Sequence, residues 1–585
     1  MSARHHRRVR HGGAFLGIHG MDPFRWLKHY DQGVPATLAP YPQRTLLDCL
    51  ADTVRARPDH PFLLFKGASL SYRNVARLSD NLAASLVAHG LGKGDRVAIV
   101  MPNCPQAIVA QLGAWKAGAI AAPMNPLYTE RELACTLQTC GATMAIVLTP
   151  FYGRIKHVQP RTSVTRVVAA NIKEHLPPLV RLLFTLFKER KGGHRIALDP
   201  ADLWFADLVG SAAATPAPPV AIGKDDPALL LFTGGTTGTP KAATGTHHAL
   251  LVSGMQINAW TRSVLPDWEG SRMMAMPLFH VYGNVALLAS SLIGHNPLVL
   301  VPNPRDIDDV LATIRKARPA VLPGVPTLYN ALLEHPAVKA GKVDLRSLTL
   351  CVSGAAPLLA DTKRRFEALS GGRIIEGYSL TESMLAMIAN PVEGVNKPGS
   401  VGIPFPDVEV RIVDAEDGGA ELPPGRIGEL TLRAPQVMAG YWQSPGETAE
   451  VLRDGWLYTG DLAYMDEDGY TFIVDRKKDL IKPSGFQVWP REVEEVIAAH
   501  AAVTEVAVAG VRDAHQGEAV KAWVVLKPGA AATVQEIRAF CRERLAAYKV
   551  PKHVEFRDGL PKSMIGKVLR RALREEDARA DAARR

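Results

Sequence analysis

One short stretch of the chain combines residue types that suit phosphate binding. An apolar run at 228–232 leads into Thr233-Gly234-Gly235-Thr236-Thr237-Gly238-Thr239-Pro240-Lys241, which predicts a buried strand followed by a flexible loop. Glycines let backbone N–H groups approach an anion, threonine hydroxyls add donors, and Lys241 supplies a positive charge. In the Walker A loop glycine directly precedes the lysine, whereas here Pro240 stands there and disfavours a continuous helix. The stretch therefore indicates a phosphate loop of another kind, although turns of this composition also serve as plain connections.

No covalent nucleophile of the hydrolase type accompanies this loop. The run Gly377-Tyr378-Ser379-Leu380-Thr381 has threonine where the G-x-S-x-G pattern ends in glycine. Chemistry on a bound phosphate can instead depend on positioning and on cations placed where negative charge develops.

Alternating helical and strand patterns precede the loop. Ser71 is a candidate N-cap for a helix that ends before Gly90, and residues 96–101 form an apolar run typical of a buried strand. Because such alternation implies βαβ units, we predict an α/β domain with parallel-rich sheets. The pattern continues with expected helices at 105–117 and 129–140 and expected strands at 119–123 and 143–148.

The last hundred or so residues indicate a small α+β domain. We expect helices from Pro490 to about His500 and from Thr533 to about Ala547, with strands at 503–511 and 521–526. A charged break at 475–479 marks the boundary. The predicted division is a disordered basic extension at 1–24, a large domain at 25–475, a hinge at 476–480 and a small domain at 481–585.

Composition and charge narrow the class of protein. The chain has 585 residues, of which 47% are hydrophobic and 22% charged, so we expect several globular domains. Part of the net charge of +10 lies in the first eleven residues, and no basic cluster is organised around exposed aromatic residues, so we predict no nucleic-acid binding. The six cysteines show no metal-ligand spacing and suit a reducing cytoplasm.

Residues 171–191, NIKEHLPPLVRLLFTLFKERK, combine an apolar stripe with basic residues. The stretch is too short, and too interrupted by Arg181, to span a bilayer. It suits a helix lying on an anionic membrane surface, which would make the protein peripheral at the inner face of the membrane. A helix packed within the domain is the equally weighted alternative.

Six motifs in a fixed order carry a more specific resemblance. Each is short, but together they resemble the adenylate-forming superfamily of acyl-CoA synthetases, firefly-type luciferases and peptide-synthetase adenylation domains. The narrower match is to bacterial long-chain fatty-acyl-CoA synthetases, through Gly324–Asn330, Ser353–Pro357, Trp26–Tyr30 and the insertion around residue 180. Ala242, where most members have glycine, is a departure. The motifs are the loop at 233–241, Pro277-Leu-Phe-His280, Gly377-Tyr-Ser-Leu-Thr-Glu382, Tyr458-Thr-Gly-Asp461, Arg476-Lys-Lys-Asp479 with Ser484-Gly485, and Pro561-Lys-Ser-Met-Ile-Gly-Lys567.

The resemblance implies activation of a long-chain fatty acid with ATP and Mg²⁺ to acyl-AMP, followed by transfer to CoA, and a distorted β-barrel subdomain in the large domain. It implies catalytic roles for Lys567, Glu382, Thr381 and His280, and a hinge at Lys478. The metal would be bound by Thr233 and Glu382, CoA by Ser484 and Gly485, and the acyl chain by Gly324, Val325 and Thr327. ATP would be bound by Thr233, Gly234, Gly235, Thr236, Thr237, Gly238, Lys241, Gly354, Ala355, Glu376, Gly377, Tyr378, Ser379, Asp461 and Arg476.

Other interpretations stay open at this point. A fatty-acyl-AMP ligase that loads a carrier protein would usually carry an insertion near the small domain, whereas only 14 residues separate Asp461 from Arg476. A catalytically silent nucleotide or lipid binder is a third reading. Taken singly, His280 could be a buried structural histidine, Glu382 a helix-start carboxylate and Lys567 a solvated residue of a basic tail. The oligomeric state also stays open, although homodimers are common among similar enzymes.

Overall fold

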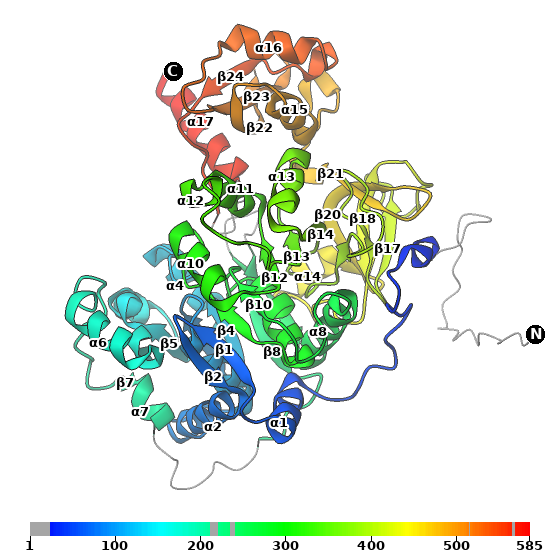
Figure 1. Ribbon diagram of the computed structural model, residues 1–585. Helices are drawn as coiled ribbons and strands as arrows, with labels where there is room; N and C mark the ends of the chain where they lie inside the picture. The colour runs from blue at the N-terminus through cyan, green and yellow to red at the C-terminus, as the bar shows by residue number, and fades with distance from the viewer. Residues whose placement is uncertain (1–23, 211–219, 234–239, 514, 564–567, 585) are drawn as a thin grey trace, which may run out of the picture.

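The computed structural model describes residues 24–210, 220–233, 240–513, 515–563 and 568–584, which form a large and a small lobe (Figure 1). The large lobe contains three sheets, and the small lobe contains one. This arrangement confirms the predicted α/β domain followed by a smaller α+β domain. The predicted basic extension, apart from its last residue, lies outside the described residues.

The first alternating segment forms a seven-stranded sheet with the order β7-β6-β5-β3-β4-β8-β9. Its strands run parallel except for the antiparallel pair β8 and β9. The predicted cap is present, since the Ser71 hydroxyl accepts a hydrogen bond from the backbone N–H of Asn74. The strands are β3 (Arg96–Val100), β4 (Ile120–Met124), β5 (Met144–Leu148), β6 (Arg166–Ala170), β7 (Leu203–Trp204), β8 (Pro227–Thr233) and β9 (Lys241–Thr246), and the helices are α2 (Tyr72–Ala88), α3 (Pro105–Lys116), α4 (Glu130–Cys140), α5 (Tyr152–Val158) and α7 (Phe205–Gly210).

A nine-stranded sheet, with the order β16-β15-β14-β13-β12-β10-β11-β1-β2, carries the next motifs. Its central strands are parallel, so the carboxyl ends of β12, β13 and β14 lie side by side. Crevices at such ends are where open α/β sheets bind ligands. The strands are β1 (Pro61–Phe65), β2 (Ala68–Ser71), β10 (Arg272–Met274), β11 (Leu298–Leu300), β12 (Val321–Gly324), β13 (Leu350–Ser353), β14 (Arg373–Tyr378), β15 (Ile388–Ala389) and β16 (Ile403–Pro404).

Helices cover this second sheet and join it to the first. The apolar run at 284–302 forms a helix, a turn and a strand. The helices are α1 (Leu46–Ala56), α8 (His247–Thr261), the π-helix η5 (Tyr282–Ala289), α9 (Ser290–Gly294), α10 (Ile307–Ala317), α11 (Pro326–Glu334), α12 (Pro336–Lys339) and α13 (Ala360–Ser370).

The third sheet of the large lobe is antiparallel and has five strands. It occupies the part of the large lobe for which the resemblance implies a distorted β-barrel. The N-terminal turn η1 (Arg25–His29) lies against it (Figure 1), because Trp26 is buried and Lys28 pairs with Asp468. The elements are β17 (Glu409–Val413), β18 (Gly428–Arg433), α14 (Pro445–Val451), β19 (Leu452–Arg453), β20 (Trp456–Met465) and β21 (Thr471–Arg476).

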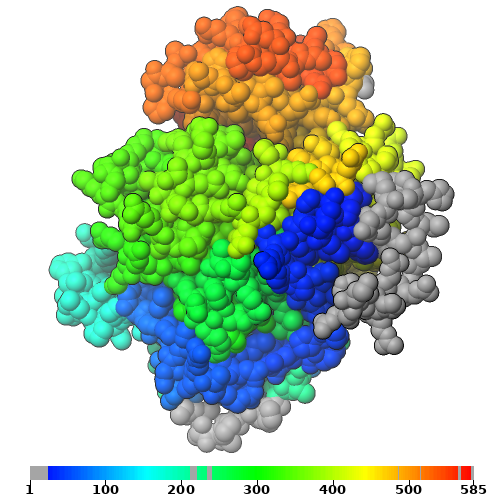
Figure 2. Space-filling model, turned by 45° about the vertical axis from the view of Figure 1, so that its right-hand side comes forward, coloured from blue at the N-terminus to red at the C-terminus, as the bar shows by residue number. Residues whose placement is uncertain are grey.

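The small lobe has a core of its own and sits on top of the large lobe (Figure 2). Its three-stranded sheet pairs β22 with β23 antiparallel and β23 with β24 parallel. The second predicted helix is shorter than expected, since α16 ends at Arg542. The elements are the turns η6 (Lys477–Asp479) and η7 (Pro483–Gly485), α15 (Pro490–Ala498), β22 (Val503–Asp513), β23 (Gly517–Leu526), α16 (Val534–Arg542), η8 (Ala547–Lys549), β24 (His553–Phe556) and α17 (Arg570–Arg584).

The segment 171–191 folds into two short pieces, η4 (Ile172–His175) and α6 (Pro178–Phe187). The break falls at Leu176 and Pro177, because proline restricts the residue before it and cannot donate a backbone hydrogen bond. The helix lies at the periphery of the large lobe (Figure 1), and none of its residues is buried. The alternative of a helix packed within the domain is therefore wrong.

Candidate functional site

The carboxyl ends of β12, β13 and β14 bring together backbone from three sequence motifs. The N–H of Gly354, just after β13, donates to the carbonyl of Gly324 at the end of β12 (3.2 Å). A Cβ on Gly354 would lie 3.4 Å from the Tyr282 ring and 3.5 Å from the Gly377 carbonyl, so these two groups border the backbone at this position. Ala355 has a φ of +67°, a strained conformation that is enriched at functional sites.

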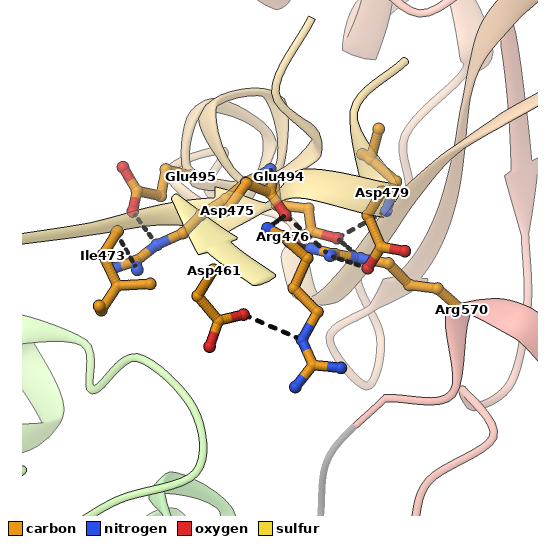
Figure 3. A network of polar contacts seen from close by, with 10 residues as sticks. Asp461, Ile473, Asp475, Arg476, Asp479, Glu494, Glu495 and Arg570 are labelled. Carbon is orange, nitrogen blue, oxygen red and sulfur yellow. Dashed lines mark hydrogen bonds and ion pairs between the residues drawn. The ribbon is translucent and has the colours of Figure 1, made fainter. Parts of the chain in front are cut away.

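Tyr378 and Asp461, distant in sequence, meet beside these strand ends. The Tyr378 hydroxyl donates to Asp461 Oδ2 (2.7 Å), and Arg476 Nε lies 3.2 Å from Asp461 Oδ1 (Figure 3). Asp461 and Arg476 face each other because β20 pairs with β21 at these residues. Burial and the Asp461 carboxylate raise the pKa of Tyr378 well above its usual value, so the phenol stays a donor. The arrangement presents a buried, oriented carboxylate that can accept hydroxyl groups of a ligand.

The two ends of the predicted phosphate loop close a β-hairpin. Thr233 ends β8 and pairs with Lys241, the first residue of β9. Lys241 Nζ lies 2.9 Å from Glu447 Oε1 and 5.1 Å from the centre of the Tyr441 ring. The five other loop residues of the predicted ATP site, Gly234, Gly235, Thr236, Thr237 and Gly238, lie outside the described residues.

Thr381 and Glu382 follow β14 in a short turn that polar contacts hold in place. Ser379 Oγ and Ser383 Oγ are 3.0 Å apart, and the Glu382 carbonyl accepts from the N–H of Met438 (3.0 Å). The Tyr441 hydroxyl donates to Glu382 Oε1 (2.9 Å). One oxygen of this half-buried carboxylate is thus fixed by the protein.

These groups fit Mg²⁺. The ion prefers oxygen ligands and is usually held by one or two carboxylates together with substrate phosphates and waters. Glu382 offers such a carboxylate, and Thr233 offers a hydroxyl at the end of β8. Within the residues that the structure describes, no three His, Cys, Asp or Glu side chains gather as metal ligands. A donor set of one carboxylate and one hydroxyl suits an ion whose other ligands are substrate phosphates and waters.

The predicted acyl-binding residues surround the end of β12. Gly324 is its last residue, Val325 is buried, and Thr327 is exposed in the first turn of α11. His280 is half-buried, and its Nδ1 accepts from the backbone N–H of Tyr282 (3.2 Å). Nearby, burial raises the pKa of Glu376.

The hinge motif joins the two lobes next to this site. Partial desolvation and Arg476 lower the pKa of Lys478, against the attraction of Asp479, Asp461 and Glu382. Ser484 has a φ of +49°, and its N–H donates to the Gln516 carbonyl (2.9 Å), while Gly485 completes η7. Lys567 lies outside the described residues.

A guanidinium group on α17 binds three carboxylates around the hinge (Figure 3). Arg570 lies 3.2 Å from Asp475, 3.3 Å from Asp479 and 2.7 Å from Glu494. These carboxylates outweigh desolvation and raise the pKa of Arg570, so it stays charged. Sequence reasoning missed Arg570, Tyr441 and Glu447. Arg570 lies in a basic C-terminal segment, where charged residues are usually solvated, and none of the six motifs contains Tyr441 or Glu447.

Comparisons with known proteins agree with this arrangement. Residues 50–442 match the family model described as AMP-binding enzyme, and residues 492–567 match the AMP-binding enzyme C-terminal domain. A long-chain-fatty-acid–CoA ligase of Bacillus subtilis is 40% identical over 94% of this chain and 98% of its own. Another from Escherichia coli O157:H7 is 38% identical over the same shares.

Solved structures show the same fold. ATP-bound MatB from Rhodopseudomonas palustris has a TM-score of 0.77 at 32% identity, covering 91% of this chain and 99% of that one. The anthranilate CoA ligase AuaEII in complex with anthranoyl-AMP has a TM-score of 0.80 at 27% identity, covering 93% and 98%.

Proposed function

Because the chain belongs to the AMP-binding enzymes, and among them to the long-chain fatty acid–CoA ligases, we propose that the site described above carries out both steps of fatty acid activation. The enzyme uses ATP, Mg²⁺ and CoA. In the first step the fatty acid carboxylate attacks the α-phosphorus of ATP, and pyrophosphate leaves. In the second the CoA thiol attacks the acyl carbonyl carbon, a thioester forms, and AMP leaves. The supporting observation is the convergence of Tyr378 and Asp461 beside Glu382 at the carboxyl end of β14.

Each group of residues has a role in this scheme. Lys241 and the loop from Thr233 to Gly238 bind the β- and γ-phosphates, and Thr381 contacts the α-phosphate. Glu382 and Thr233 would hold Mg²⁺, which neutralises phosphate charge when bound. Tyr378 stacks on adenine beside Gly354, Ala355, Glu376, Gly377 and Ser379, and Asp461 with Arg476 binds the ribose hydroxyls. His280, Gly324, Val325 and Thr327 line the acyl path.

The small domain supplies the remaining groups. Lys567 contacts the fatty acid carboxylate and the α-phosphate in the first step. Rotation at Lys478, within the hinge at 476–480, then withdraws the domain at 481–585 and brings Ser484 and Gly485 to the CoA thiol path. One site of the 25–475 domain thereby serves both steps.

A substrate panel tests this function. The panel runs from acetate to oleate, and the readout is the AMP released in the presence of CoA. We expect the highest kcat/KM for fatty acids with long chains. The carrier-protein alternative predicts product only when an acyl carrier protein replaces CoA. A silent binder predicts no ATP–pyrophosphate exchange with any acid.

The ribose role of Asp461 predicts a change in ATP affinity. Asp461→Ala removes charge-assisted hydrogen bonds worth about 2 kcal/mol, so the KM for ATP should rise about thirtyfold. Asp468→Ala is the matched control, because this carboxylate of the same subdomain pairs with Lys28 and Lys397. An unaltered ATP KM in the Asp461 variant would remove this residue from the ribose site.

We propose that α6 attaches the enzyme to anionic lipid at the cytoplasmic face of the membrane. Six of the fourteen large apolar side chains that are exposed in the described ranges belong to this helix, among them Leu182 (54%), Leu186 (66%) and Phe187 (66%). Phe184 instead packs edge-on against His194, and the centres of the two rings are 5.2 Å apart. One side of the helix therefore packs on the protein through Phe184, and the other side exposes apolar side chains. None of the helices in the described ranges has the length and apolar character that crossing a bilayer requires.

The charges around α6 complement anionic lipid. Arg181, Lys188, Arg190 and Lys191 are exposed around the apolar face. The acidic residue among them, Glu189, is paired with Lys173 at 2.5 Å. A helix with an apolar face and basic flanks binds in the interface of an anionic bilayer.

Vesicle sedimentation tests the membrane contact. Leu182→Asp/Leu186→Asp should reduce the fraction that sediments with phosphatidylglycerol vesicles at least tenfold, because each buried leucine contributes about 1.5–3 kcal/mol. Val395→Asp/Ile427→Asp, which changes two other exposed apolar side chains, should sediment like the original protein. Unchanged sedimentation of the α6 variant would reject the contact.

We also propose a homodimer, the state expected from similar enzymes. Light scattering should give twice the 63.3 kDa chain mass. If the α6 variant instead becomes monomeric and still binds vesicles, this helix is a contact between two copies.

A further inference from the structure

The segment between β18 and α14 links the phosphate hairpin to the turn that carries Glu382. Trp442 N–H donates to the Ala242 carbonyl (2.8 Å), and Ala439 N–H donates to the Thr244 carbonyl (2.9 Å). Residues 439–442 therefore run alongside β9. On its other side, Met438 N–H donates to the Glu382 carbonyl (3.0 Å). The backbone of β9 and that of Glu382 are therefore held by one short segment.

Tyr441 extends this link to the side chains. Its hydroxyl donates to Glu382 Oε1 (2.9 Å), and its ring lies 5.1 Å from Lys241 Nζ. Tyr441 is 8% exposed, so both contacts are shielded from water.

Glu447, the third residue of α14, completes the group. Its carboxylate lies 2.9 Å from Lys241 Nζ. In this structure the lysine is thus paired with a carboxylate of the protein and lies over an aromatic ring. A triphosphate that binds Lys241 must replace Glu447 as its partner.

We propose that Tyr441 is a positioning residue that sets Glu382 and Lys241 for the triphosphate and its metal, and that Glu447 is the partner that Lys241 exchanges for phosphate. The hydroxyl fixes Oε1 of Glu382, and this carboxylate would hold the ion. The ring keeps the lysine within reach of the same phosphates through a cation–π contact. This inference rests on the proposed roles of Lys241 and Glu382.

Tyr441→Phe separates the two contacts of the tyrosine, because it removes the hydroxyl and keeps the ring. With a non-hydrolysable ATP analogue present, the Mn²⁺ dissociation constant measured from the free-ion electron paramagnetic resonance signal should rise about tenfold. The Mg²⁺ concentration that gives half-maximal ATP–pyrophosphate exchange should rise by a similar factor. The ATP KM at saturating Mg²⁺ should stay within twofold, because Lys241 keeps its ring contact.

Tyr470→Phe is the matched control, since this buried tyrosine of the same subdomain also loses one hydroxyl bond, to the Val395 carbonyl (2.8 Å). It should leave metal affinity unchanged. Glu447→Gln should act in the opposite direction and lower the dissociation constant of the metal-free ATP analogue about threefold, because a competing carboxylate is removed.

Two outcomes would overturn the inference, and they differ from failure of the proposed function. If Glu382→Gln weakens Mn²⁺ binding but Tyr441→Phe does not, the positioning role is wrong while the metal role of Glu382 stands. If Glu382→Gln itself leaves Mn²⁺ binding intact, the metal role fails. Weaker analogue binding in Glu447→Gln would contradict the exchange of partners.

Discussion

Replacing Lys567 by alanine is expected to reduce ATP–pyrophosphate exchange about 10³-fold while leaving thioester formation from supplied acyl-AMP within about threefold. The first step places extra negative charge on the α-phosphate, and a positioned cation there is worth about 3–4 kcal/mol. The second step transfers an acyl group that is already activated, and in the proposed scheme it takes place with this lysine withdrawn. The two half-reactions are measured separately, by exchange of labelled pyrophosphate and by release of AMP from acyl-AMP and CoA.

Lys562→Ala is the matched control for this prediction. Lys562 belongs to the same basic segment but pairs with Glu505 on β22 within the small lobe. It should affect both half-reactions little. If Lys567→Ala depresses both steps equally, the proposed division of labour between two orientations of the small domain is wrong.

Local signals in the sequence predicted the elements that carry the site. Ser71 caps α2, Pro490 opens α15, and the antiparallel pairing of β8 with β9 agrees with the expectation that Pro240 prevents a strand-to-helix loop. These features depend on a few neighbouring residues, so the sequence is sufficient. The segment around Pro177 was less predictable, because a continuous apolar stripe hid a break that the proline imposes.

Contacts between distant polar residues could not be predicted in the same way. Tyr441 meets Glu382 across 59 positions, and Arg570 meets Asp475 across 95. Periodicity reports which face of an element is apolar, but the partner of a polar side chain depends on how the sheets are placed. The motifs therefore predicted the residues proposed to contact the ligand, but not the residues, such as Tyr441 and Arg570, that hold those residues and the hinge in place.

Arg570 is the second residue for which we expect a large effect, because its contacts cross the predicted hinge. Asp475 ends the predicted large domain, whereas Asp479 and Glu494 follow the hinge at Lys478 (Figure 3). Arg491 of the small lobe also contacts residues before the hinge. Its backbone N–H donates to the Asp475 carboxylate (2.8 Å), and its guanidinium donates to the Ile473 carbonyl (2.6 Å). A further bond joins the two lobes, since Arg305 of the large domain donates to the Ser563 carbonyl (3.5 Å). These bonds hold the small lobe in one orientation over the large one.

We expect Arg570→Gln to reduce ATP–pyrophosphate exchange about thirtyfold and to spare thioester formation from supplied acyl-AMP. Removing one partner from a buried ion cluster costs about 3–5 kcal/mol, because the remaining carboxylates are left desolvated and without their counter-charge. Glu494 lies in the same lobe as Arg570, so only the share of the cost that belongs to the contact with Asp475, about 2 kcal/mol, falls on the orientation seen here. The population then shifts toward other orientations of the small lobe. Tryptic cleavage within 476–482 should become faster as the hinge is exposed more often.

Arg571→Gln removes the same charge from the next residue of α17 and serves as the control, since Arg571 pairs with Glu575 on its own helix (2.7 Å). Arg570→Lys keeps a cation but loses the planar fork that reaches several carboxylates, so its effect should be intermediate. Should Arg570→Gln slow both half-reactions alike, with hinge cleavage unchanged and the small lobe melting earlier, the arginine stabilises that lobe and does not select its orientation. Selective loss of the first half-reaction together with faster hinge cleavage would identify the arginine as the contact that keeps the small lobe over the nucleotide.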